Sequence, residues 1–194
     1  MLPKLKPLIF YGSLLSFAYL AFLHQTRTLG QTALILLSIV IFTKPLVKLF
    51  PTISFFKILL VLRRELGQAT AFAVLAHVFS QVAPGFSLTK LLLFASTTRP
   101  NNFIFWGFWS LVLILPLLIT SNDFSTKLLK RNWFRLQKLI HPLYVFAMLH
   151  YGLNKGTPIL IFVLFVLVLL YSLRFLAGRN VQFLINSKPI SPTP

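Results

Sequence analysis

The sequence contains no cysteine, and Glu65 and Asp123 are its only acidic residues among 194. The absence of cysteine excludes disulfide bonds and every metal site that needs thiolate ligands. Charged residues make up 11% of the chain and hydrophobic residues 57%. This composition excludes an ordinary soluble domain and predicts an integral membrane protein.

Six apolar stretches each approach the ~20 residues that a helix needs to cross a hydrocarbon core of ~30 Å. They are residues 8–24, 31–49, 66–83, 102–120, 136–153 and 158–176. These stretches leave almost no chain for a soluble domain, so we expect one transmembrane domain over residues 1–194. The fold class is therefore expected to be all-α, a bundle of six transmembrane helices, and the Pro- and Ser-rich residues 177–194 are expected to form a flexible tail.

The distribution of positive charge predicts the orientation. With a cytoplasmic N-terminus, the outer side holds only Arg27, Lys90, Arg99 and Lys155, and the other fifteen Lys and Arg residues are inside. This asymmetry follows the positive-inside rule, and six spans place both termini in the cytoplasm. The net charge of +17 would suggest nucleic acid in a soluble protein, but topology accounts for it here, and membrane lipid is the expected surrounding.

Two segments are not expected to behave as ordinary spans or loops. The first helix follows a basic start, but no small-residue cleavage pattern comes after it, so we expect it to be retained. Residues 51–62 are too short to span and are expected to lie along the inner face. The outer connection, residues 84–101, is a candidate docking surface for a partner.

Two histidines lie deep within apolar spans. His77 is 13 residues beyond Arg64 and His150 is 15 beyond Arg135, so at ~1.5 Å of rise per residue both lie ~20 Å past a basic anchor. An imidazole in hydrocarbon needs a polar partner. Two histidines at matched depth can ligate one haem iron between them, and His77 and His150 are therefore the candidate metal ligands.

Four other residues are candidates for contact with such a cofactor. Thr70 and Ala73 precede His77 by seven and four residues, so they share its helix face. Small residues there favour close helix packing or leave room for a flat macrocycle. Haem carboxylates would be costly in hydrocarbon, so we expect them at the outer interface near Arg27 and Arg99.

His141 and His24 are expected to have other roles. His141 precedes His150 by nine residues, so it lies on roughly the opposite helix face, and one haem cannot use both. His141 is the candidate for a second, inner site. We nevertheless expect one haem per chain, with a neutral His141 that donates to a polar or backbone acceptor, because an unpaired imidazole in lipid is costly. His24, near a helix end, is expected to be exposed at the headgroups.

The order of several motifs resembles that of the ferric-reductase-like transmembrane family, and most closely its MsrQ/YedZ branch. The motifs are RTLGQTALILL, RRELG followed ten residues later by His77, TTRP, LLITSND, WFRL and His150-Tyr151. The resemblance covers about residues 26–176. It implies a six-helix, haem b-binding subunit of the bacterial inner membrane that donates electrons to a periplasmic molybdopterin methionine-sulfoxide reductase.

One position departs from that branch. Gln137 stands in the W-x-x-L-H stretch where the branch usually has a histidine. Glutamine is not an ordinary haem ligand. The resemblance therefore supports one haem b between His77 and His150, and it does not carry over a second haem on the inner side.

These observations together predict an electron-transfer subunit of an oxidoreductase rather than a complete enzyme. Two protein ligands leave the iron no open position, and the chain has no G-x-G-x-x-G fingerprint and no room for a flavin domain. Electrons would enter from a quinol, a bound flavin or a separate flavin reductase, and leave to an outer-face redox protein.

The alternative is a structural or assembly subunit of a larger membrane complex, with a haem that is structural or lost. A transporter is disfavoured because no acidic residue lies within the spans and no internal repeat is evident.

Overall fold

The computed structural model describes residues 2–81 and 87–186, and within this part every regular element is helical. The elements are α1 (Leu2–Phe22), α2 (Thr26–Leu49), α3 (Ser54–Val61), α4 (Arg63–Phe79), α5 (Leu88–Thr97), α6 (Phe103–Ile119), α7 (Asp123–Leu129), α8 (Arg131–Leu136), a 3-10 turn (Gln137–Leu139), α9 (Ile140–Lys155) and α10 (Thr157–Asn186). The expected all-α class is confirmed.

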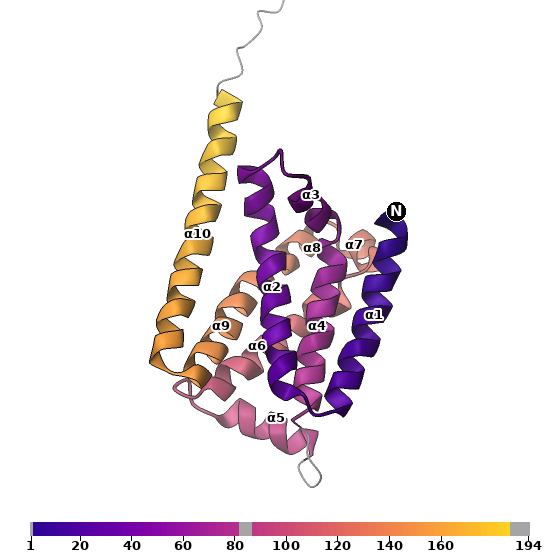
Figure 1. The fold of residues 1–194 in the computed structure, drawn as a ribbon, viewed down its shortest axis with the longest axis vertical. Coiled ribbons are helices and arrows are strands. Elements are labelled where there is room, and N and C mark those ends of the chain that lie inside the picture. The colour runs from indigo at the N-terminus through magenta and orange to yellow at the C-terminus, as the bar shows by residue number, and fades with distance from the viewer. Residues whose placement is uncertain (1, 82–86, 187–194) are drawn as a thin grey trace, which may run out of the picture.

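The helices form a bundle in which α1 and α10 lie on opposite sides (Figure 1). α2 packs against α4, α6 packs against α9, and α1 contacts α4 while α10 contacts α9 and α2. α5 lies across one end of the bundle and contacts α6 (Figure 1). Side-chain caps explain where two of these helices begin, because Ser87 accepts from the Lys90 amide and Asn102 accepts from the Ile104 amide.

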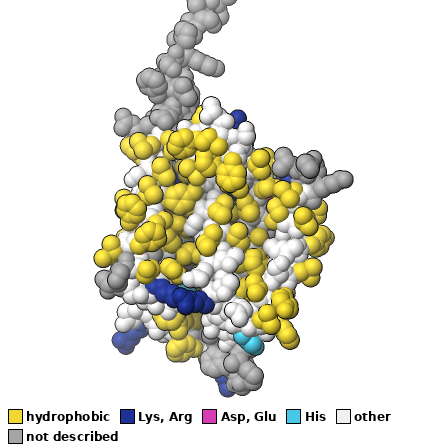
Figure 2. Space-filling view, in the orientation of Figure 1, with side chains coloured by type: hydrophobic (Ala, Val, Ile, Leu, Met, Phe, Trp, Pro, Cys, Tyr) yellow, Lys and Arg dark blue, Asp and Glu magenta, His cyan; other side chains and the backbone are white. Residues whose placement is uncertain are grey.

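The core lies where α2, α6, α9 and α10 meet. Its buried residues include Ile41, Ile114, Tyr144 and Leu170. Tyr144 is 0% exposed, and its hydroxyl lies 3.2 Å from Ser38 Oγ of α2, which satisfies a polar group that would otherwise be costly to bury. The outer surface is apolar as well, and hydrophobic side chains cover most of the face in Figure 2. Such a surface suits contact with lipid.

Length and composition identify fewer spans than the six expected. Within the described residues, two helices each contain a stretch that is long and apolar enough to cross a membrane alone: residues 5–22 of α1 and 26–49 of α2. A third qualifies if α6 and α7, which meet at 90°, count as one span. α4 and α9 have 17 and 16 residues, close to the lower limit of about 17 for a spanning helix.

The last helix is longer than the sequence-based expectation. α10 continues to Asn186, so residues 177–186, which were expected to belong to the tail, are helical. The first proline after the expected span is Pro189, and nothing before it forbids a helix. Residues 187–194 lie outside the described part, as do residues 82–86, which include the expected end of the third span at residue 83.

The fifth expected helix, 136–153, does not begin as one continuous element. α8 and the 3-10 turn come first, and α9 starts at Ile140. Pro142 is thus the third residue of α9, where its missing N–H leaves no hydrogen bond unmade. The irregular turn therefore lies just before the proline that would have broken a longer helix.

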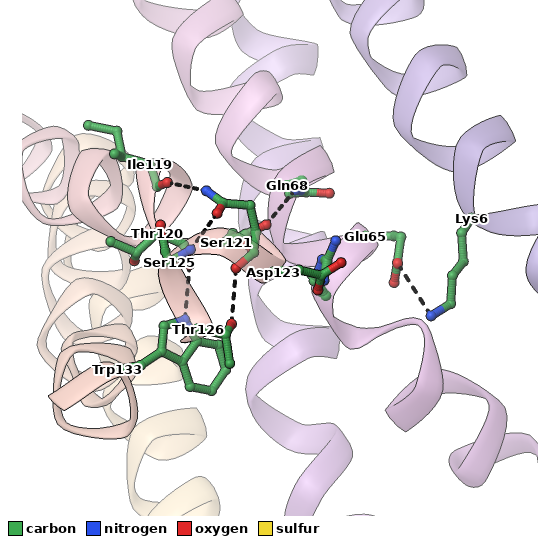
Figure 3. Close-up of polar contacts among 12 residues, drawn as sticks. Lys6, Glu65, Gln68, Ile119, Thr120, Ser121, Asp123, Ser125, Thr126 and Trp133 are labelled. Atoms are coloured by element: carbon green, nitrogen blue, oxygen red, sulfur yellow. Dashed lines mark hydrogen bonds and ion pairs between the residues drawn. The ribbon is translucent and has the colours of Figure 1, made fainter. Parts of the chain in front are cut away.

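Polar contacts join the helices at the end of the bundle opposite α5. Lys6 Nζ of α1 lies 3.7 Å from Glu65 Oε1 of α4, and the Gln68 amide donates to the Ser121 carbonyl at 2.8 Å (Figure 3). Arg64 forms an ion pair with Asp123. Both acidic residues of the chain are thus paired at this end, which is the end expected to face the cytoplasm.

Candidate haem-binding site

The structure brings His77 of α4 and His150 of α9 together. Their ring centres lie 6.3 Å apart, and the ring planes meet at 77°. A ring nitrogen lies about 1.1 Å from the centre of an imidazole and bonds to a metal at about 2.0–2.1 Å, so two rings that share one ion have centres about 6.2–6.4 Å apart. The observed separation therefore fits two rings on opposite sides of a shared iron.

Each imidazole is oriented by a backbone carbonyl from a neighbouring helix. His77 Nδ1 lies 2.8 Å from the Thr26 carbonyl oxygen of α2, and His150 Nδ1 lies 2.8 Å from the Phe103 carbonyl oxygen of α6. A carbonyl only accepts, so the proton of each neutral ring is on Nδ1 and the lone pair is on Nε2. This is how metal-binding histidines are usually held.

A glycine lies against each of these rings. A Cβ atom added at Gly30 would lie 3.1 Å from Nδ1 of His77, and one added at Gly107 would lie 2.7 Å from Nδ1 of His150. Each glycine comes four residues after the carbonyl residue that holds the same ring, so it occupies the same helix face one turn further on. The missing side chain lets the imidazole approach the helix backbone.

These features fit a haem held by two histidines. Both rings are half-buried, their Nδ1 atoms are engaged, and the two glycines form a cradle that a Cβ would fill. The chain has no cysteine, so imidazole is the strongest haem ligand available to it. His77 and His150 were predicted from their matched depth and from the family resemblance, whereas the glycines and the two carbonyl groups were not predicted.

A hydrogen-bonded cluster surrounds the backbone of His77. The Ser80 hydroxyl lies 2.7 Å from the His77 carbonyl oxygen and 2.8 Å from Thr26 Oγ1. His24 Nδ1 lies 3.2 Å from the Ser80 carbonyl oxygen, and the His24 side chain is exposed, as the sequence predicted. The cluster ties the end of α1 and the start of α2 to the end of α4.

The other four predicted contact residues divide into two groups. Thr70 and Ala73 are buried in α4, and the Thr70 hydroxyl donates to the Leu66 carbonyl of its own helix. Arg27 and Arg99 are exposed. They lie in the segments that supply the carbonyl groups of the site, since Arg27 follows Thr26 directly and Arg99 precedes Phe103 by four residues.

His141 has a different partner from the one expected. Arg174 Nη1 of α10 lies 2.5 Å from Nδ1 and 2.8 Å from Nε2 of the His141 ring. A guanidinium has donors only, so the imidazole accepts rather than donates. The partner found for His141 is thus a donor rather than the acceptor that was expected, and the ring nitrogen that accepts from Arg174 is engaged.

A cavity of about 240 Å³ lies towards the end of the bundle opposite α5. Arg63, Thr70, Trp133 and Gln137 are among its lining residues. The Gln137 Nε2 atom is buried without a hydrogen-bond partner. His141 is not among the lining residues, so no histidine pair comparable to His77 and His150 is found here within the described part of the chain, and the residues present do not fit a second haem.

Comparison with known proteins places this site in a family. Residues 29–150 match the family described as "Ferric reductase like transmembrane component". Three curated relatives carry the name "Protein-methionine-sulfoxide reductase heme-binding subunit MsrQ". The protein from Agrobacterium fabrum is 30% identical over 99 residues, covering 50% of this chain and 45% of the relative. The protein from Rhizobium meliloti is 29% identical over 92 residues, which cover 47% of this chain and 42% of the relative. The protein from Xanthomonas campestris is 33% identical over 94 residues, which cover 48% of this chain and 43% of the relative.

The matched segment spans less than half the length of each of these relatives. No solved structure gives a significant match. The family match extends over more than half of the chain and contains both His77 and His150. The chain therefore belongs to the ferric reductase like transmembrane component family.

Proposed function

We propose that this protein is a membrane electron-transfer subunit that holds one haem b between His77 and His150. The observation that carries the proposal is the 6.3 Å separation of the two imidazole centres, with each ring anchored through Nδ1 to a carbonyl. The relatives are named heme-binding subunits of a methionine-sulfoxide reductase, which supports the same cofactor and role. The protein thus serves an oxidoreductase without being a complete enzyme.

The residues of the site have distinct tasks in this proposal. His77 and His150 would hold the iron through their Nε2 lone pairs, and the carbonyl groups of Thr26 and Phe103 fix the ring orientations. A bound haem b accepts and releases single electrons, and two protein ligands keep oxygen from binding the iron.

Four further residues border the cofactor in the proposal. Thr70 and Ala73 provide small surfaces on the ligand helix α4. Arg27 and Arg99, exposed at the outer end, neutralise the haem carboxylates, since a guanidinium pairs well with a carboxylate.

We further propose that α1, α2, α4, α6, α9 and α10 are six spans of a single domain in the bacterial inner membrane, with both termini in the cytoplasm. The two ends of the bundle differ in chemistry. The inner end carries the Lys6–Glu65 and Arg64–Asp123 pairs. Six helices with this charge asymmetry follow the positive-inside rule.

The partners lie at opposite ends of the bundle in this proposal. A periplasmic molybdopterin methionine-sulfoxide reductase receives electrons at the outer end, where Leu93 and Phe94 of α5 are exposed. A quinol, or a flavin supplied by a reductase, donates at the inner cavity, where the unpaired Gln137 amide can donate to a ring carbonyl. The cavity wall at Thr70 lies seven residues from His77, about 10 Å along α4.

A reduced-minus-oxidised absorption spectrum of the purified protein tests the proposal. We expect the bands of a low-spin b-type haem. A preparation that has been supplied with haem and still shows no redox-active haem would contradict the proposal. The second candidate is a structural or assembly subunit of a larger membrane complex. It is favoured by Gln137, which stands where the related branch usually has a histidine. A haem-free or redox-inactive preparation would support this second candidate.

A further inference from the structure

Three basic side chains from three helices gather around His141. Arg174 of α10 contacts the His141 ring at 2.5 and 2.8 Å. Arg63 of α4 and Lys44 of α2 lie nearby, since Lys44 comes one helical turn after Val40, the α2 residue that Arg63 contacts. Arg63 is held there because its Nε donates to the Val40 carbonyl oxygen of α2 at 3.3 Å. We call Lys44, Arg63 and Arg174 the basic cluster.

Neither acidic side chain of the protein pairs with this cluster. The sequence has two acidic residues, and in the structure Glu65 contacts Lys6 while Asp123 contacts Arg64. Arg63 and Arg174 are half-buried and Lys44 is exposed beside them. Like charges held close together at an apolar surface repel one another, so an anion from outside the chain would stabilise the basic cluster.

An apolar groove begins beside the cluster. It runs along α10 and is lined by Leu167, Val168, Tyr171, Ser172, Phe175 and Leu176. Tyr171 lies near Arg174. The lining residues extend over nine positions of α10, from Leu176 back to Leu167, about 14 Å along the helix, so the groove passes the level of Arg174 and runs towards the middle of the proposed span.

We propose that the basic cluster binds the phosphate of an anionic phospholipid of the inner leaflet, with one acyl chain lying in the α10 groove. Basic pockets between transmembrane helices on the cytoplasmic side are suited to acidic lipid headgroups. A free phosphate would satisfy the cations, but it would leave the groove without a role. The site is independent of the haem proposed above, and it relies only on the proposed orientation of the bundle.

Lipid titration of the full-length protein tests the site. The protein is purified in a neutral detergent, stripped of lipid, and titrated with phosphatidylglycerol, phosphatidylcholine or inorganic phosphate, and bound lipid is counted by native mass spectrometry. We expect one phosphatidylglycerol to bind preferentially, with phosphatidylcholine at least about fivefold weaker and millimolar phosphate unable to displace the lipid. Equal binding of the two lipids, or complete displacement by phosphate, would overturn the proposal.

Substitutions locate the binding. Arg174→Gln and Lys44→Gln should each weaken phosphatidylglycerol binding at least about fivefold, because each charge near an anionic headgroup contributes about 1 kcal/mol. Arg174→Lys should retain most of the affinity. Lys155→Gln is the matched control, since this exposed cation lies 14 residues along α9 from His141, about 21 Å away, and should change binding by less than about twofold.

Circular dichroism and a monodisperse elution profile establish that each variant is folded. If Arg174→Gln does not fold, Lys44→Gln carries the test, because that lysine makes no hydrogen bond to His141. Wild-type affinity in a folded Lys44→Gln or Arg174→Gln variant would refute the site.

Discussion

His77 and His150 each depend on two features of a neighbouring helix, a carbonyl oxygen at 2.8 Å and a glycine against the ring. His77→Ala or His150→Ala should abolish the normal low-spin b-type spectrum, because each removes one of the two side chains that would hold the haem iron. Absorption spectra of the purified variants provide the measurement. His24→Ala is the control, since that exposed histidine hydrogen-bonds Ser80 and should leave the spectrum unchanged. A normal spectrum in either ligand variant would disprove the assignment.

Alanine substitutions at the two glycines of the site should affect haem binding to different degrees. A Cβ at position 107 would lie 2.7 Å from the His150 ring, whereas one at position 30 would lie 3.1 Å from the His77 ring. Gly107→Ala should therefore lose most of the bound haem, and Gly30→Ala should retain haem with an altered paramagnetic resonance spectrum. Gly12→Ala, which has open space around it, should have no effect.

Alanine in place of a helical glycine favours the helix by about 1 kcal/mol, so a general loss of stability would not explain haem loss in Gly107→Ala. Equal haem content in the Gly107→Ala and Gly12→Ala variants would show that Gly107 is not needed to hold the His150 ring for haem binding.

His141 carries the prediction of a single haem. Because its ring accepts from Arg174 and does not line the inner cavity, His141→Ala should leave both haem content and spectrum unchanged. A pyridine haemochrome assay should give one haem per polypeptide. Two haems per chain, with one lost in His141→Ala, would overturn this interpretation.

At the scale of helices, the hydrogen bond between Tyr144 of α9 and Ser38 of α2 joins two parts of the core. Tyr144→Phe should lower the free energy of unfolding by about 0.5–1.5 kcal/mol, the usual net contribution of one hydrogen bond. Ser38→Ala should cost at least as much because it leaves a fully buried hydroxyl unpaired. Thermal unfolding of both single variants and the double variant measures the coupling, and strictly additive effects would show that the bond contributes nothing.

Helix existence was easier to predict than helix boundaries. Each expected span corresponds to a helix in the structure, because apolar composition is a strong signal. The end of α10 was missed because an apolar window ends at residue 176, although no proline follows until Pro189 and α10 runs on through Gly178. The Gly30 and Gly107 contacts were missed for a different reason: a glycine in an apolar helix usually indicates helix packing, and its contact with a distant ring depends on tertiary structure.

At the scale of the whole molecule, the absence of cysteine makes the proposed topology directly testable. Single cysteines placed at Lys57, Lys130 and Lys155, all exposed, introduce the only thiols in the chain. In intact spheroplasts, a membrane-impermeant maleimide should label the cysteine at position 155 and spare those at 57 and 130, which should react only after lysis. Labelling of position 57 or 130 before lysis would reverse or refute the proposed orientation.

The site also contains the same arrangement of a backbone carbonyl, a glycine and a histidine twice. Thr26, Gly30 and His77 form one half, contributed by α2 and α4, and Phe103, Gly107 and His150 form the other, contributed by α6 and α9. In each half the glycine follows the carbonyl residue by four positions. This pattern can be used to interpret divergent sequences. In a chain that keeps the histidine but carries a larger residue at the glycine position, the imidazole could not lie against the helix in this orientation.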